Sequence, residues 1–261
     1  MSRAGTGRRL TALGAMLGGV LGGTALAWHA GPALTAIGPL RTRLTPGLAG
    51  VGQSDRVALT FDDGPHPQST PRFLEELDRL GVRATFFLLG RWVARAPGLV
   101  ADLVAAGHEV GLHGYDHRCL LLRGFTATYG DLARGQDVIA EATGAVPRWY
   151  RPPYGVLTGP ALEVTRRLGL TPVLWTAWGA DWTARATPDS ITRTVLADLS
   201  GGGTVLLHDS DVTSAPGSWR ATLAALPGIV AGCRDRGLRV GPLREHGSPR
   251  AADPVGIGGT R

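Results

Sequence analysis

The chain of 261 residues contains no lysine and no asparagine, and it has only two cysteines. The absence of lysine excludes Schiff-base catalysis and a phosphate-binding P-loop, because both need its amine. The absence of asparagine excludes N-glycosylation acceptors. Cys119 and Cys233 could form a disulfide only outside a reducing compartment, and a body of this size needs no disulfide to hold its core. We therefore expect two unpaired thiols.

The excess positive charge lies at the ends of the chain. A net charge of +6 at pH 7 is typical of proteins that bind nucleic acid or membrane surfaces. Residues 1–54, however, hold five arginines and no acid, whereas residues 55–240 hold 19 arginines and 19 acids. A neutral body lacks the basic surface that follows phosphates, so we predict no nucleic-acid partner.

The N-terminus has the pattern of an export signal. Residues 10–40 contain no charged side chain and follow two adjacent arginines, and small residues suited to cleavage occur at Ala25 and Ala27. The same apolar run is also long enough to span a bilayer as a retained anchor. We therefore predict that residues 1–28 are a signal peptide or membrane anchor. The protein would be secreted or held on the outer face of the cytoplasmic membrane, with membrane contact only through this segment.

The rest of the chain divides into a body and two flanks. Residues 29–54 are rich in glycine, proline and threonine without a strand or helix period, which indicates a linker. Residues 241–261 have the same character and are expected to be a flexible tail. Residues 55–240 are expected to be a single catalytic domain that acts as a monomer.

Short apolar runs alternate with longer helical segments through this body. The strand candidates are 57–61, 84–89, 109–112, 149–150, 173–176 and 204–207. The helix candidates, most of which end at a glycine, are 70–80, 97–106, 126–143, 160–168, 188–199 and 219–236. Repeated strand–helix units predict parallel strands, and about seven of them predict an α/β fold, a distorted (β/α) barrel. A doubly wound open sheet is the alternative.

Polar residues cluster where the strand candidates end. These clusters are Asp62 with Asp63, His113 with His117, Arg151, Asp181, and His208 with Asp209. Because the loops after the strands build the functional face of a barrel, clusters that are far apart in sequence should meet there.

The residue types in these clusters indicate a metal-dependent hydrolase. His113 and His117 are four residues apart, so a helical turn would place both imidazoles on one face, although surface histidines without a ligand role can have the same spacing. Adding a carboxylate gives two histidines and one acid, the donor set of a catalytic zinc site with an open position. The side chains of Asp62 and Asp63 should diverge at the end of an extended strand, so that one binds the metal and the other acts as general base.

Five motifs resemble, in order, those of the polysaccharide deacetylase family with the NodB-type domain, carbohydrate esterase family 4. They are Thr60-Phe61-Asp62-Asp63-Gly64-Pro65, His113-x-x-x-His117, Arg151-Pro152-Pro153-Tyr154, Asp181-Trp182 and Leu206-Leu207-His208. The resemblance covers about residues 55–240, and the first motif alone is distinctive. It implies an enzyme that removes acetyl groups from the N-acetylated sugars of an envelope or extracellular polysaccharide, of the peptidoglycan or chitin type.

The resemblance also implies roles for the motif residues. Asp62 would be the general base, oriented by Arg151, while Asp63, His113 and His117 would hold the metal, usually zinc in this family although cobalt or nickel also occur.

The remaining motif residues would act on the substrate. The backbone N–H of Tyr154 would stabilise the oxyanion, and His208, paired with Asp181, would protonate the leaving amine. Trp182 and Leu206 would enclose the acetyl methyl group.

The chain departs from the family pattern at two positions. Gly114 stands where many members have serine or threonine, and Trp178 stands where many have aspartate. Neither change removes a ligand, the acid or the base, so the departures concern substrate contacts and hydrogen bonds around the site. Asp209 is expected only to cap the next segment.

Two other functions fit the motifs less well. A carbohydrate-binding module on an inactive scaffold would be expected to lack the base, a ligand or the acid, and none is missing. An O-deacetylase of acetylated xylan would use the same catalytic residues, because sugar contacts lie on variable loops.

Overall fold

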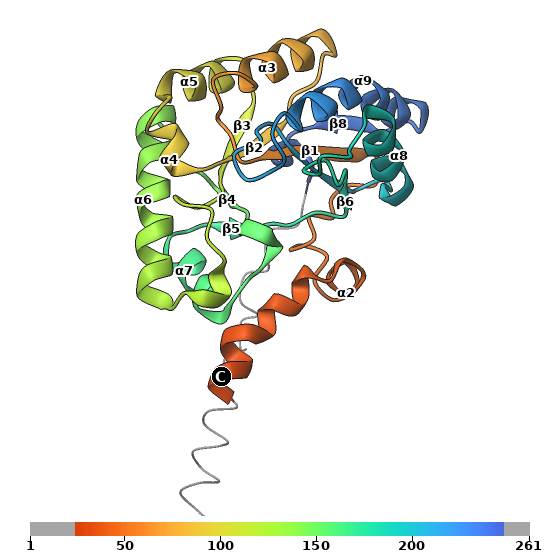
Figure 1. The fold of residues 1–261 in the computed structure, drawn as a ribbon. Helices are drawn as coiled ribbons and strands as arrows, with labels where there is room; N and C mark the ends of the chain where they lie inside the picture. Colours follow the sequence, from red (N-terminus) through yellow and green to blue (C-terminus); the bar gives the residue numbers. More distant parts are fainter. Residues whose placement is uncertain (1–23, 248–261) are drawn as a thin grey trace, which may run out of the picture.

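The computed structural model describes residues 24–247, whose arrangement is drawn in Figure 1. The strands in this part are β1 (Arg56–Asp62), β2 (Thr85–Leu88), β3 (Glu109–Leu112), β4 (Trp149–Tyr150), β5 (Thr171–Pro172), β6 (Ala177–Trp178), β7 (Thr204–His208) and β8 (Arg239–Gly241). The α-helices are α2 (Gly38–Leu44), α3 (Thr70–Arg79), α4 (Gly90–Val93), α5 (Pro97–Ala105), α6 (Phe125–Thr143), α7 (Gly159–Arg167), α8 (Pro188–Asp198) and α9 (Trp219–Asp235). Four short 3-10 helices are η1 (Gly31–Ala36), η2 (Leu120–Leu122), η3 (Pro153–Gly155) and η4 (Leu243–Glu245).

The strands form one curled parallel sheet. Seven of them lie in the order β5-β4-β3-β2-β1-β7-β6, and β8 pairs with the first residues of β1. Within the part of the chain that the structure describes, β5 and β6 do not pair with each other, so the barrel is open between them. The predicted distorted (β/α) barrel is confirmed, and the doubly wound alternative is wrong.

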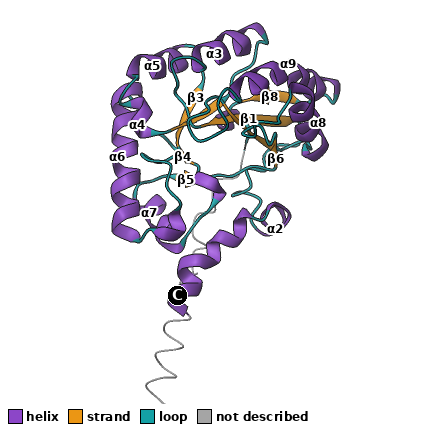
Figure 2. Ribbon diagram, in the orientation of Figure 1, coloured by secondary structure: helices purple, strands orange, loops and turns teal. Residues whose placement is uncertain are grey.

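Helices cover the outer face of the sheet and bury its central strand (Figure 2). Val57 to Asp62 of β1 are all buried, which explains why this strand reads as an almost unbroken apolar run. Phe61 packs against Phe86 of β2 and Phe73 of α3, with ring centroids 5.0 Å and 5.2 Å apart. These contacts fix the strand that carries the first motif to its neighbouring strand and to one of the helices that cover the sheet.

The main helices begin and end close to their predicted bounds. α8 starts with a reciprocal capping box between Thr187 and Ser190, and α6 ends at Gly144, whose φ of +74° is the left-handed conformation that glycine tolerates. The sequence prediction did not include α4, a single turn too short to show a period. Cys119 and Cys233 are unpaired, as expected.

The strand predicted over 173–176 is not formed. The chain crosses the gap between β5 and β6 there, and several of its backbone groups bond to partners outside a strand ladder. Arg151 donates to the carbonyls of Val173 and Leu174, at 3.4 Å and 2.9 Å, and the amide of Leu174 donates to the carbonyl of Leu48. A segment whose carbonyls receive guanidinium groups cannot use them in a strand ladder.

The flanks are more ordered than their composition suggests. The segment 29–54, expected to have no helices, contains η1 and α2, and Arg41 and Ala49 within it are buried. Beyond Gly241, the buried ring of His246 lies 3.0 Å from the carbonyl of Gly50 and 2.9 Å from that of Gly202. Burial and hydrogen bonding, which glycine- and proline-rich composition does not reveal, fix both flanks to the sheet.

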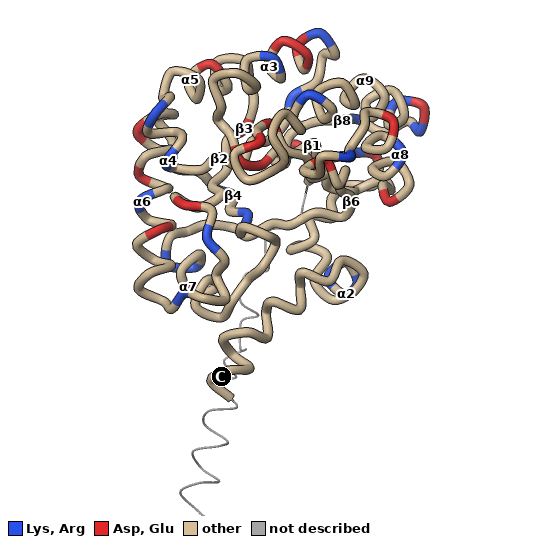
Figure 3. The backbone as a smooth tube through the Cα atoms, viewed as in Figure 1, with Lys and Arg blue, Asp and Glu red and all other residues tan. Residues whose placement is uncertain are grey.

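Charge and hydropathy of the described residues agree with the sequence analysis. Basic and acidic positions are interspersed over the helices of the body in Figure 3. Between residues 24 and 247, no helix is both long and apolar enough to cross a membrane. The predicted cleavage or anchoring run lies largely in 1–23, outside the described residues.

Burial in the core lowers the pKa of one histidine, His108. Its ring is buried, packs edge-on against Phe86, and accepts a hydrogen bond from the amide of Ala84 at 3.1 Å. Burial, reinforced by the charges of Arg83 and Arg244, lowers the pKa of His108 to about 4. At pH values between about 4 and the ordinary histidine pKa, the unfolded chain therefore binds a proton at His108 that the folded protein does not bind.

This difference in proton binding predicts a loss of stability in acid. As pH falls from about 6.5 to about 5, proton binding by the unfolded chain at His108 should remove up to ~2 kcal/mol of unfolding free energy. The substitution His108→Gln keeps an acceptor for the Ala84 amide and should lose correspondingly less over the same interval. Urea unfolding at the two pH values measures both losses. If the wild-type protein and His108→Gln lost the same unfolding free energy, His108 would not be the source of the loss.

Candidate active site

A cavity of about 300 Å³ opens at the carboxyl ends of β1, β3 and β7. Polar motif residues and aromatic side chains share its wall, which is made by Asp62, His113, His117, Tyr154, Gly155, Trp175, Trp178, Trp182, Leu206, His208, Thr213 and Ser214. Motif residues from five separate parts of the sequence thus converge, as the placement of polar clusters after strands predicted.

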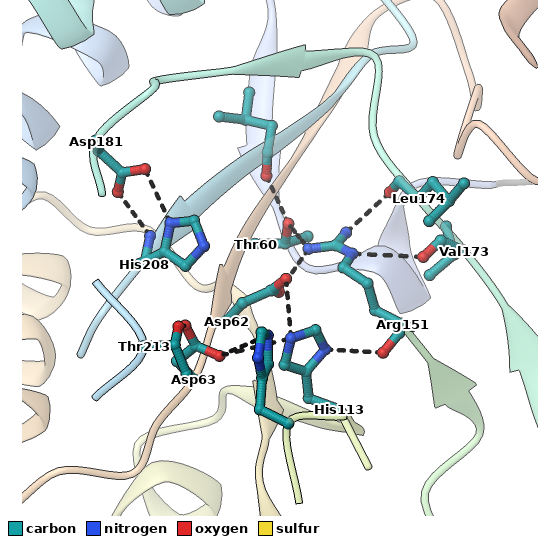
Figure 4. Close-up of polar contacts among 12 residues, drawn as sticks. Thr60, Asp62, Asp63, His113, Arg151, Val173, Leu174, Asp181, His208 and Thr213 are labelled. Carbon is teal, nitrogen blue, oxygen red and sulfur yellow. Dashed lines mark hydrogen bonds and ion pairs between the residues drawn. The ribbon is translucent and has the colours of Figure 1, made fainter. Parts of the chain in front are cut away.

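Asp62 is held by a buried ion pair at the end of β1. Its Oδ1 accepts a hydrogen bond of 2.8 Å from Nη1 of Arg151, and the same nitrogen donates to the hydroxyl of Thr60 at 2.7 Å. The Arg151 side chain is 0% exposed and that of Asp62 is 4% exposed. Figure 4 shows the guanidinium lying between the carboxylate and the carbonyls of Val173 and Leu174. Asp62 is therefore a charged, oriented oxygen acceptor facing the cavity.

Asp63 does not continue the extended strand as expected. Its φ is +80°, a left-handed conformation that is uncommon outside glycine. This turn places Oδ1 of Asp63 3.5 Å from Nε2 of His113 and 3.7 Å from Nε2 of His117. The hydroxyl of Thr213 donates a short hydrogen bond to the other oxygen. Oδ2 of Asp62 lies 3.8 Å from the same Nε2 of His113, so the backbone turn, and not strand geometry, sets how the two neighbouring carboxylates are placed.

The two histidines lie on a loop and not on a helical turn, so the predicted geometry is wrong although the convergence is correct. The loop follows β3 and turns at Gly114, whose φ is +92°. A side chain at Gly114 would be strained and would meet Asp131 at 3.0 Å, which explains the departure from serine or threonine there. Nδ1 of His113 lies 2.8 Å from the carbonyl of Arg151, which directs Nε2 towards Asp63.

The cluster of Asp63, His113 and His117 has the properties of a metal site. One candidate ligand atom from each residue lies within 4.8 Å of the others. Oδ1 of Asp63 is buried and has no hydrogen-bond partner among the described residues. Burial, followed by the neighbouring His113, lowers the pKa of His117 to about 4, so its imidazole is neutral. One carboxylate and two imidazoles, of which that of His117 is neutral, are a donor set for a divalent cation such as zinc.

His208 and Asp181 form the second charged pair of the site. Nδ1 of His208 lies 2.9 Å from one oxygen of Asp181, and the other oxygen accepts from the His208 amide and from the hydroxyl of Thr222. Burial alone would lower the pKa of His208, but the charge and hydrogen bond of Asp181 outweigh it and raise the pKa to about 10. The imidazole is therefore protonated and oriented, as a general acid requires.

Three tryptophans line one side of the cavity. The rings of Trp178 and Trp182 are 4.7 Å apart, and those of Trp175 and Trp178 are 6.4 Å apart. Leu206, which is buried, lines the same cavity, and Tyr154 packs edge-on against His117 at 4.5 Å. Trp178, the second departure from the family pattern, therefore extends an apolar wall suited to sugar rings.

Three residues near the site were missed or misinterpreted from the sequence. Thr213 lies in a loop without a pattern, and Trp175 was included in a strand that does not form. Asp209 does not cap a helix, because it is buried and accepts a hydrogen bond of 2.7 Å from Thr70. Burial raises its pKa to about 7. It lies so close to Gly64 that a β-carbon there would meet it at 2.5 Å.

Comparison with known proteins assigns the family. Residues 49–173 match the sequence profile described as polysaccharide deacetylase. A chitooligosaccharide deacetylase of Bradyrhizobium is 36% identical over 197 residues, which cover 72% of this chain and 88% of that protein. The chain belongs to the polysaccharide deacetylase family.

Other members of this family show how varied it is. A peptidoglycan-N-acetylglucosamine deacetylase of Listeria monocytogenes is 39% identical over 160 residues, 61% of this chain and 34% of that protein. The chain thus spans about a third of the length of this relative. A CE4 family pseudoenzyme from Bacillus anthracis has a structure with TM-score 0.67 and 28% identity, covering 74% of this chain and 65% of its own. Membership therefore defines the fold, and the site residues must be assessed individually.

The metal cluster generates the first prediction about the site. His117→Ala should leave a folded protein without stoichiometric metal, because two ligands cannot hold the ion. Thr213→Val removes the hydroxyl that orients Asp63 and should weaken zinc binding by about 10- to 100-fold. Metal analysis after dialysis and competition with a chelator measure these effects. His66→Ala, on a loop that does not line the cavity, is the matched control and should keep its metal. Full occupancy in His117→Ala would refute the cluster.

Proposed function

We propose that the chain is a metal-dependent hydrolase that removes acetyl groups from N-acetylated sugars of an envelope or extracellular polysaccharide of the peptidoglycan or chitin type. The observation that carries this proposal is that a candidate base and a candidate acid, of opposite charge, line the same cavity. Asp62, an ionised acceptor, and His208, a protonated donor, both line the cavity that contains the cluster of two histidines and Asp63. The deacetylase names of the Bradyrhizobium and Listeria relatives support the same chemistry.

Asp63, His113 and His117 would hold the divalent metal, zinc, because they offer one carboxylate oxygen and two imidazole nitrogens. Such an ion polarises the acetyl carbonyl and makes water more acidic. Asp62 accepts the proton of the attacking water, since its Oδ1 is held by Arg151 and its Oδ2 remains near the cluster, 3.8 Å from Nε2 of His113.

The leaving group and the acetyl group would be handled on the other side of the cavity. His208 donates its proton to the sugar nitrogen, because an amine leaves readily only when protonated, and Asp181 holds the ring in place through Nδ1. The backbone N–H of Tyr154 stabilises the oxyanion. Trp182 and Leu206 enclose the acetyl methyl group on the apolar side.

An inactive carbohydrate-binding scaffold is the second candidate, since a pseudoenzyme shares the fold. The presence of both charged pairs and a complete set of candidate ligands favours the enzyme. The O-deacetylation of xylan remains the alternative within the same chemistry.

The proposed reaction can be tested by acetate release. Loaded with zinc, the protein should release acetate from N-acetylated chitooligosaccharides or from peptidoglycan faster than from acetylated xylan. Asp62→Asn should keep its metal but lose kcat by about 10²-fold or more, because the acceptor of the water proton is gone. His208→Ala should behave in the same way, because the leaving nitrogen stays unprotonated.

Three outcomes would count against this assignment. Near wild-type turnover in Asp62→Asn or His208→Ala would show that the roles are wrong. Preferential release from xylan would favour the O-deacetylase. Binding of glycan without any release of acetate by the metal-loaded protein would favour the inactive scaffold.

We further propose that the protein is exported and works outside the cytoplasmic membrane, as a monomer that touches the membrane only through its N-terminal segment. The apolar, acid-free start of the chain and the wall-acting relatives support export. N-terminal sequencing of secreted and membrane fractions should find the chain either shortened after Ala27 or intact and membrane-bound. An intact chain soluble in the cytoplasm would contradict export and the envelope substrate with it.

A further inference from the structure

The N-terminal flank reaches the wall of the catalytic cavity. Trp175 lines that cavity and belongs to the segment 173–176, which crosses the open side of the barrel between β5 and β6. The two ends of this segment are bonded to the sheet, since the amide of Val173 donates to the carbonyl of Tyr150 and the amide of Thr176 to the carbonyl of Thr204, but Leu174 and Trp175 between them lie outside the ladder. The position of these two residues therefore depends on the individual hydrogen bonds made to their backbone.

Arg41 of α2 contacts Trp175 directly. Its side chain is 2% exposed, and Nη2 donates to the carbonyl of Trp175 at 2.5 Å while Nη1 donates to the carbonyl of Thr35 at 2.8 Å. The guanidinium carbon also lies 5.0 Å from the centroid of the Trp175 ring. One side chain from the flank thus contacts both the backbone and the indole of a cavity residue.

The indole of Trp175 is in turn packed against the catalytic groups. The guanidinium carbon of Arg151 lies 5.9 Å from its ring centroid, so two arginines lie within reach of one indole. A β-carbon added at Gly155 would meet the Trp175 ring at 2.6 Å, which shows how closely the ring lies on the turn after Tyr154. Any displacement of the indole would therefore change the cavity wall next to Arg151, which pairs with the proposed base Asp62, and next to the turn at Tyr154.

Adjacent contacts reinforce the same connection. The carbonyl of Leu48 accepts from the amide of Leu174 at 2.7 Å, and the carbonyl of Gly50 accepts from the hydroxyl of Thr204 at 2.7 Å. The flank is therefore bonded to the crossing segment and to β7, on either side of Trp175. Burying an arginine at this junction requires all its acceptors to stay in place.

We propose that Arg41 is a positioning residue that fixes Trp175 in the wall of the catalytic cavity, so that the flank which follows the export segment is part of the catalytic unit. Arg41 itself does not line the catalytic cavity, and it acts through Trp175. The expected consequence for turnover rests on the proposed deacetylase function. The expected consequence for the indole does not.

The position of the indole can be followed by fluorine NMR on the full chain labelled with 5-fluorotryptophan. Trp175→Phe identifies the resonance of Trp175 among the seven tryptophans. In Arg41→Met this resonance should shift or broaden, while those of Trp92 and Trp219, on distant helices, stay unchanged. Arg43→Met is the matched control, because Arg43 is an exposed residue of the same helix and its loss should leave all seven resonances in place.

Two results would overturn the positioning role. An unchanged Trp175 resonance in folded Arg41→Met is the first. If Arg41→Met does not fold, Arg41→Lys decides, because lysine keeps one donor for the Trp175 carbonyl but loses the planar contact with the ring. A spectrum of Arg41→Lys with an unmoved Trp175 resonance is the second overturning result.

Kinetic measurements on the same variants test whether the position of Trp175 affects substrate binding and turnover. Arg41→Met should raise KM for the N-acetylated substrate about tenfold with kcat within about threefold, and Arg41→Lys should recover part of the loss. Combining Arg41→Met with Trp175→Phe should cost no more than Trp175→Phe alone, because the arginine acts through the indole. Additive losses would contradict the proposal. If the wild-type protein releases no acetate, the proposed function fails, while the NMR result still decides the position of Trp175.

Discussion

The rest of the structure depends on one buried guanidinium. Arg151 is fully enclosed, so each of its donors needs an acceptor inside the protein. It finds them on β1 at Asp62 and Thr60, and on the crossing segment at the carbonyls of Val173 and Leu174. Since Arg151 itself follows β4, one side chain joins the centre of the sheet to its open side. One group thus orients the Asp62 carboxylate and holds the segment that crosses the open side of the barrel.

Parallel register places the other groups around this pair. Asp62 of β1 is the ladder partner of His208 of β7, so the acceptor and the donor of the proposed reaction leave neighbouring strands at the same height. Leu112 of β3 is paired with Tyr150 of β4, which brings His113 and Arg151 side by side just beyond the sheet. The left-handed turn at Asp63 then directs the next carboxylate to the histidines. Register and one backbone turn are sufficient to assemble the site from distant motifs.

The sequence predicted those parts that follow from periodicity and from residue type. Apolar runs defined β1 and β7, glycine stops defined the ends of most helices, and polar residues after strands defined the cavity. The sequence could not predict that His113 and His117 converge through a loop turned at Gly114, because spacing alone does not specify backbone conformation. It also missed the order of the flank around Arg41, since long-range contacts such as that with Trp175 leave no local pattern.

At the open side of the barrel, the shape of the cavity wall is set by other residues than those that would carry out the reaction. Strand ladders are made of backbone groups and form with almost any side chains, whereas the middle of the crossing segment at 173–176 also depends on two arginine side chains, Arg151 at the Leu174 carbonyl and Arg41 at the Trp175 carbonyl. Substitutions in the flank can therefore reshape the wall at Trp175 while the strand ends that carry Asp62 and His208 stay in register. Under the proposed function, the shape of the sugar-facing wall would therefore depend in part on a segment that lies outside all five motifs.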